Sequence, residues 1–132
     1  EVRTREDMPD GWAVTQNNLG AALARRGERV EGQEAIALMG GAITAFRSTL
    51  EVRALDDLPV DWALTQENIG LALESLADCD LDRRWQHLQE AREAVTLSLE
   101  VFDPENMPFN FEKAKKCLAR IEAKIAEHCS DD

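Results

Sequence analysis

Histidine and cysteine are scarce in this chain of 132 residues, and tyrosine is absent. Two histidines, His87 and His128, are too few to assemble a nucleophile, a base and an orienting group, and no glycine-rich phosphate loop follows a strand. Three cysteines without a CxxC pair fit reduced thiols in the cytoplasm better than a disulfide framework. We therefore expect a cytoplasmic chain with no catalytic residue, no metal site and no cofactor.

One acidic cluster resembles a metal site at first sight. Asp78, Asp80 and Asp82 have the spacing that opens a calcium-binding loop. Arg83 stands where that loop needs its glycine, however, and Gln89 stands where it needs its closing glutamate. We expect these aspartates to cap the N-terminus of a helix instead.

Basic residues are also few, because 15 Lys and Arg face 26 Asp and Glu, for a net charge of −11. We therefore expect no nucleic-acid partner, since phosphate binding needs a broad basic surface. No stretch approaches the apolar length that spans a bilayer, and no charged-then-apolar leader opens the chain. We therefore expect no membrane partner, and the acidic surface favours basic or neutral protein partners.

What the chain does have is an internal repeat. Residues 1–23 (EVRTREDMPDGWAVTQNNLGAAL) recur at a shift of fifty as residues 51–73 (EVRALDDLPVDWALTQENIGLAL), with thirteen of the twenty-three aligned pairs identical. At a shift of forty-nine, Pro108 and Phe111 match Pro59 and Trp62, so a third, degenerate copy follows. A period of this size predicts an all-α fold of stacked antiparallel helix pairs.

Caps and breakers set the expected helices at about 10–26, 33–54, 59–77, 78–101 and 109–128. Gly27 is expected to end the first helix in the left-handed conformation. The organisation is then a single repeat domain. It has a preceding repeat's tail at 1–8, repeats at 9–58 and 59–107, and a degenerate capping helix at 108–129. Because the chain begins inside a repeat and without Met, we expect an excerpt from a longer array.

The recurring residues have the spacing of a packing face. Gly20 and Gly70 recur in the first helix of each pair. Because glycine is a poor helix former, its recurrence at this position indicates that a neighbouring helix approaches closely there. A ladder of small, large and small residues recurs in the second helices, where it lets two backbones approach. Its members are Ala42, Phe46 and Thr49, and then Ala91, Val95 and Ser98.

These residues resemble the tetratricopeptide repeat (TPR) family over nearly the whole chain. Leu19-Gly20 and Ile69-Gly70 match the family's Leu-Gly element, and the two ladders match its second-helix element. The WAxTQxNxG string is similar to long-repeat bacterial members, which often adjoin effector modules. The period of fifty exceeds the standard period of about 34. The resemblance implies a TPR-like α-solenoid, with a partner groove lined by the first helices.

The groove residues follow from that resemblance and the helical spacing. They are Val14, Asn17, Asn18, Ala21 and Arg25 in the first copy, Leu64, Glu67, Asn68, Leu71 and Ser75 in the second, and Lys113, Lys116, Cys117, Arg120 and Lys124 in the third. The partner-binding residues we predict are Asn17, Asn18, Glu67, Asn68, Leu71, Lys113, Lys116 and Arg120. The positions for the family's carboxylate clamp lack basic residues, so chaperone tails are not expected.

Two features of this groove have alternative interpretations. Asn18 and Asn68 can hold a peptide backbone, because an amide both donates and accepts, or they can bond their own helix or water. The basic stripe, defined as Lys113, Lys116, Arg120 and Lys124, can hold an acidic segment, or it can be a solvated face that caps the array.

The leading hypothesis is a non-catalytic scaffold that binds a protein or peptide in its groove. One alternative is a structural repeat that forms homo-oligomers through its exposed ends. Another is a regulatory segment of a larger signalling protein with an attached effector module.

Overall fold

The structure is a computed structural model that describes residues 9–52 and 58–130. These residues form five α-helices and one short 3₁₀-helix, with no strand in either described range. The expected all-α class and five helices are therefore confirmed. The elements are α1 (Pro9–Gly27), α2 (Gly32–Val52), α3 (Pro59–Cys79), η1 (Leu81–Arg83), α4 (Arg84–Leu99) and α5 (Pro108–Ser130).

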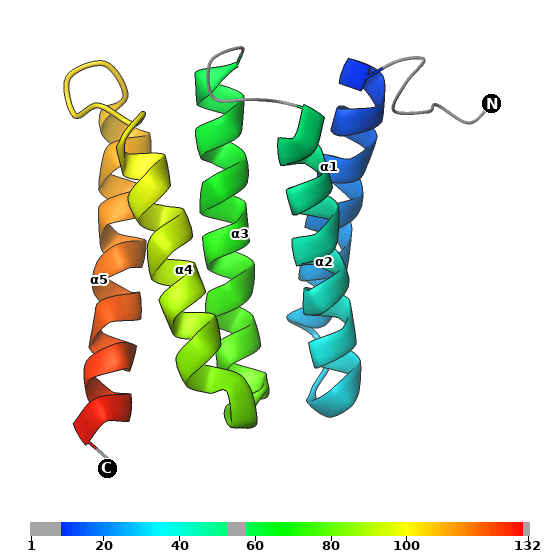
Figure 1. The fold of residues 1–132 in the computed structure, drawn as a ribbon, viewed down its shortest axis with the longest axis vertical. Coiled ribbons are helices and arrows are strands. Elements are labelled where there is room, and N and C mark those ends of the chain that lie inside the picture. The colour runs from blue at the N-terminus through cyan, green and yellow to red at the C-terminus, as the bar shows by residue number, and fades with distance from the viewer. Residues whose placement is uncertain (1–8, 53–57, 131–132) are drawn as a thin grey trace.

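The helices stand side by side with their long axes roughly aligned (Figure 1). Helix α1 packs along α2, and α3 packs along α4, so the chain forms two antiparallel pairs. Helix α2 also packs against α3, and α4 packs against α5. Contacts between α1 and α3, and between α3 and α5, are much narrower. The first helices of successive pairs therefore adjoin along one side of the molecule.

One predicted helix boundary is wrong, and one helix ends in a conformation other than the predicted one. Gly27 is the last residue of α1 but does not have the expected positive φ, because the Glu28 amide continues the helical pattern to the Ala24 carbonyl at 3.0 Å. The left-handed residue is Gly32, with a φ of 68°, at the start of α2. The fourth helix does not open at Asp78, since α3 runs to Cys79 and η1 precedes α4.

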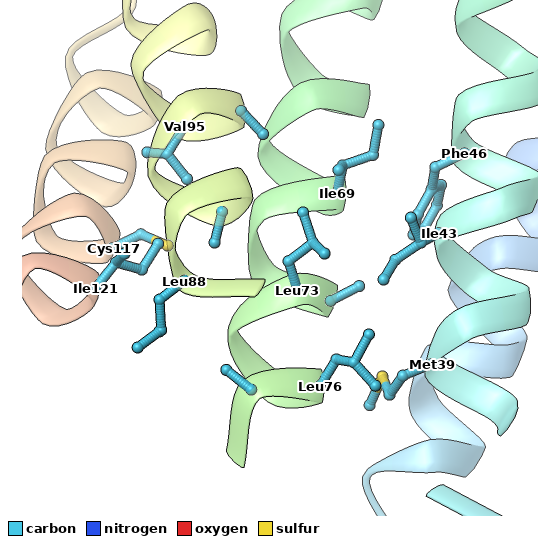
Figure 2. Close-up of a cluster of buried hydrophobic side chains, with 14 of the residues drawn as sticks. Met39, Ile43, Phe46, Ile69, Leu73, Leu76, Leu88, Val95, Cys117 and Ile121 are labelled. Atoms are coloured by element: carbon cyan, nitrogen blue, oxygen red, sulfur yellow. The ribbon is translucent and has the colours of Figure 1, made fainter. Parts of the chain in front are cut away.

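The hydrophobic core centres on α3. In Figure 2, Ile69, Leu73 and Leu76 of α3 lie beside Phe46 and Met39 of α2. The core continues across α4 to α5 through Leu88, Val95, Cys117 and Ile121, all of them almost fully buried. Burial of each large apolar side chain contributes about 1.5–3 kcal/mol, so α3 is the best-anchored helix.

Close approach within each pair occurs at the repeated glycines, as predicted. A methyl group added to Gly20 would lie 2.7 Å from the Phe46 ring, and one added to Gly70 would overlap the Val95 side chain. The α1–α2 pair is also joined by a buried hydrogen bond, in which the Thr49 hydroxyl donates to the Ala13 carbonyl at 3.3 Å. The small residues of the ladders thus serve packing.

Helix α2 corrects one conclusion from the sequence. By length and composition it could cross a membrane, so the statement that no stretch approaches this length is wrong. Residues 35–46, between Glu34 and Arg47, include no charged side chain, which makes this helix so hydrophobic. In the structure, Met39, Ile43 and Phe46 of α2 are buried in the core beside α3. A helix at the centre of a helical core has the same composition as a membrane span.

Candidate partner-binding groove

A hollow of about 330 Å³ lies between the first helices of the two pairs. Ala21 and Ala24 of α1 form one wall, and Leu71 of α3 forms the other. Met39 and Phe46 of α2 form its floor. We call this site the α1–α3 hollow. Its floor is fully packed, so its shape is set by core residues that cannot readily move.

Three of the predicted partner-binding residues line this hollow, namely Asn68, Leu71 and Arg120. Asn68 is half-buried, and its side-chain amide has no hydrogen-bond partner among the described residues. It can therefore donate to and accept from a ligand. The remaining predicted residues do not line it: they are Asn17, Asn18, Glu67, Lys113 and Lys116.

Comparison of the two repeat junctions explains why the hollow exists. At the junction between α3 and α5, Glu74 accepts hydrogen bonds from Arg120 at 3.1 and 2.9 Å and lies 2.9 Å from the Lys124 ammonium. The equivalent positions between α1 and α3 are Ala24 and Leu71. Shorter side chains replace the ion pairs there, so the first junction stays open while the second is filled.

The basic stripe is not a free basic surface. Lys113 lies 3.7 Å from Glu67, Arg120 pairs with Glu74, and Lys124 pairs with both Glu74 and Asp78. Carboxylates of α3 therefore pair with three of the four stripe cations, so little of the charge of the stripe is available to an acidic segment. Of the four stripe cations, only Lys116 has no ion-pair partner within residues 9–52 and 58–130.

Charge on Glu74 is stabilised by these partners. Burial alone would raise the pKa of this carboxyl, but hydrogen bonds from Arg120 and Lys124 outweigh burial and hold its pKa below 4.5. Cys117 lies against the same carboxylate. Burial and the charge of Glu74 raise the pKa of the Cys117 thiol to about 11, so this thiol is protonated at neutral pH.

Glu67 is less well compensated. It is only 2% exposed, and its Oε2 atom has no hydrogen-bond partner in the described part of the chain. Burial raises its pKa above 4.5, although Lys113 acts in the opposite direction. At the equivalent position of the first copy, the side-chain oxygen of Asn17 is also buried without a partner. These two groove positions therefore weaken the fold slightly.

We expect Glu67→Met to stabilise the chain by about 1 kcal/mol at pH 7. Lys113 is half exposed and stays hydrated when its partner is removed, so no buried charge remains. Because the folded-state pKa of Glu67 is raised, its carboxyl favours folding below pH 4.5 and disfavours it as the pH rises through that pKa.

The measurement is urea unfolding at pH 5 and pH 8, with the gain larger at pH 8. Lys113→Met serves as the control, since it removes the partner and retains the buried carboxylate. Easier unfolding of Glu67→Met than of the original chain at pH 8 would show that the carboxylate stabilises the fold.

The acidic cluster does not cap a helix. Asp80 stands at the N-cap of η1 but makes no capping hydrogen bond, and its carboxylate lies 2.9 Å from Nε2 of the buried His87. Asp78 accepts from Arg84 at 3.2 Å. Ion pairing with α4 and α5 thus replaces capping. No group of three metal-ligating side chains gathers anywhere in the described ranges.

Comparisons with protein-family models, with curated proteins and with solved structures gave no match to this chain. The function must therefore be argued from the groove itself. Sequence reasoning missed the floor residues Met39 and Phe46 as well as Glu28 at the mouth. The sequence does hold one signal for the difference between the open α1–α3 junction and the filled α3–α5 junction. The first copy has alanine at position 24, and the second copy has glutamate at the equivalent position 74.

Proposed function

We propose that the chain is a non-catalytic interaction module of the TPR type, which binds a protein or peptide segment in the groove formed by its first helices. The α1–α3 hollow carries this proposal. It draws residues from α1, α3 and α5, and Ala21, Asn68, Leu71, Ser75 and Arg120 are all positions that the repeat spacing assigns to the groove. An apolar floor with few polar groups is typical of ligand sites.

The packing order supports a TPR-like solenoid. The first helix α3 packs on α4, the second helix of its own pair, and on α2, the second helix of the preceding pair. The period of fifty residues gives each pair longer helices than a standard repeat. In this proposal α5 is the degenerate third copy of the first helix, and it packs against α4.

One face of α1 supports membership in a longer array. Leu19 is 47% exposed, whereas its equivalent Ile69 is 3% exposed because α2 covers it. Ala22 and Arg26 are also exposed, and their equivalents Ala72 and Leu76 are buried. A further helix of the α2 kind would cover this face.

The same face favours a second candidate function, in which copies of the chain associate end to end. An uncovered apolar helix face promotes self-association. Light scattering over a range of concentrations separates the two functions. A mass that stays monomeric at every concentration would remove self-stacking, and a mass that rises with concentration would support it.

The groove is tested by filling the hollow. Ala21→Trp places an indole among the lining residues, and we expect it to reduce capture of bound proteins from the native lysate by about tenfold or more. Ala37→Trp on α2 is the matched control, because Ala37 is exposed and lies outside the hollow. Equal capture by both variants would place the binding surface elsewhere.

A further inference from the structure

The chemistry of the α1–α3 hollow defines the segment that fits it. Its volume of about 330 Å³ is near the lower end of the roughly 300–1,000 Å³ found for ligand pockets. Met39 and Phe46 at its base are each 2% exposed, and Leu71 and Ala72 line its α3 wall. Such a site accepts an apolar side chain and part of a peptide backbone.

The charged groups at the rim of the hollow differ in whether they already have an ion-pair partner. Arg120 is at the rim, but its guanidinium is already paired with Glu74 and offers little to an anion. Glu28 lines the other side, is exposed, and has no ion-pair partner in the described structure. The rim therefore carries one unpaired charge, and this charge is negative.

A second, smaller hollow of about 260 Å³ adjoins the first and extends this acidic character. The two share Glu28, Met39 and Ser75, and the smaller one is also lined by Asp78. Asp78 is neutralised by Lys124 and Arg84, so Glu28 remains the available carboxylate. The net charge of −11 adds a long-range attraction for cationic segments.

We infer, on the basis of the proposed function, that the groove recognises a peptide with an apolar side chain followed or preceded closely by Lys or Arg. The apolar side chain occupies the α1–α3 hollow, and the cation pairs with Glu28. The Asn68 amide donates to and accepts from the peptide backbone beside the anchor. This specificity is opposite to the acidic segment that one of the two interpretations of the basic stripe allows.

The test is selection from a phage-displayed library of random dodecapeptides on the immobilised chain. Peptides that also bind Ala21→Trp are removed in a counter-selection. We expect the enriched peptides to carry Leu, Ile, Met or Phe within four residues of Lys or Arg. Their affinity is then measured by fluorescence anisotropy of the labelled synthetic peptides.

Glu28→Gln is expected to weaken the enriched peptides about two- to fivefold at low ionic strength, and less at high salt. Glu31→Gln is the matched control, because Glu31 is also exposed and charged but lies outside the hollow. Circular dichroism checks that every variant keeps its helical content. An effect of Glu31→Gln as large as that of Glu28→Gln would overturn the role of Glu28.

The remaining outcomes separate this inference from the proposed function. Enriched peptides that are acidic, or that before counter-selection bind Ala21→Trp as tightly as the original chain, overturn the inference but leave peptide binding intact. A library that yields no enriched peptide overturns both the inference and the proposed function.

Discussion

Replacing Gly70 with alanine will destabilise the chain by about 2 kcal/mol, although alanine is the better helix former. The new methyl group would overlap the Val95 side chain and lie 3.4 Å from the Ala91 carbonyl oxygen. Val95 is fully buried and has no free space to rotate into. Helices α3 and α4 must therefore separate, which weakens contacts along the whole pair.

Gly40→Ala is the matched control for this substitution. A methyl group added to Gly40 meets nothing within 4 Å, so the full gain in helix propensity of up to about 1 kcal/mol is expected. In a Val95→Ala background, Gly70→Ala should cost little, because the clashing methyl groups are gone. Urea unfolding followed by circular dichroism measures all four variants. Equal effects of Gly70→Ala and Gly40→Ala would show that the α3–α4 contact is looser than described.

Replacing Glu74 with alanine will lower the free energy of unfolding by about 2 kcal/mol at pH 7. Glu74 is 6% exposed, and its bonds to Arg120 and Lys124 join α3 to α5 beside the Lys113–Glu67 and Lys124–Asp78 pairs. Its pKa is held below 4.5, so this stabilisation is present above pH 4.5. It is lost as the pH falls through the folded-state pKa.

Thermal unfolding at pH 7 and at pH 3 gives the comparison. The difference between Glu74→Ala and the original chain should be larger at pH 7 than at pH 3. Glu93→Ala is the control, because Glu93 is exposed on α4 and its loss should change stability by about 0.5 kcal/mol or less. A cost of Glu74→Ala that is the same at both pH values would mean that packing, and not charge, is responsible.

The helices could be predicted because their signals are local. Pro59 and Pro108 open helices in the structure as they do in the sequence pattern, and the repeat places them in register at a shift of forty-nine. Errors arose where tertiary contacts compete with local preference. Asp80 is a residue type that commonly caps helices, but here its carboxylate lies within hydrogen-bond distance of the buried His87 and does not cap.

Part of the lining of the α1–α3 hollow could be predicted from the sequence. Helical spacing placed Asn68 and Leu71 beside the hollow, since both follow from the register of α3. Neutralisation of Arg120 could not be predicted, because it depends on Glu74, which lies forty-six residues away along the chain. A glutamate at a position that holds alanine in the other copy is ordinarily interpreted as surface charge, and buried carboxylates are uncommon.

The filled junction between α3 and α5 has a mechanical consequence. Glu74, Arg120 and Lys124 brace these two helices against bending, and the α1–α3 junction has no such brace. Relative motion of neighbouring first helices is therefore expected to be easier at the α1–α3 junction than at the α3–α5 junction. Under the proposed function, a peptide bound in the α1–α3 hollow would touch both α1 and α3 and so supply at this junction the link that Glu74 supplies at the other.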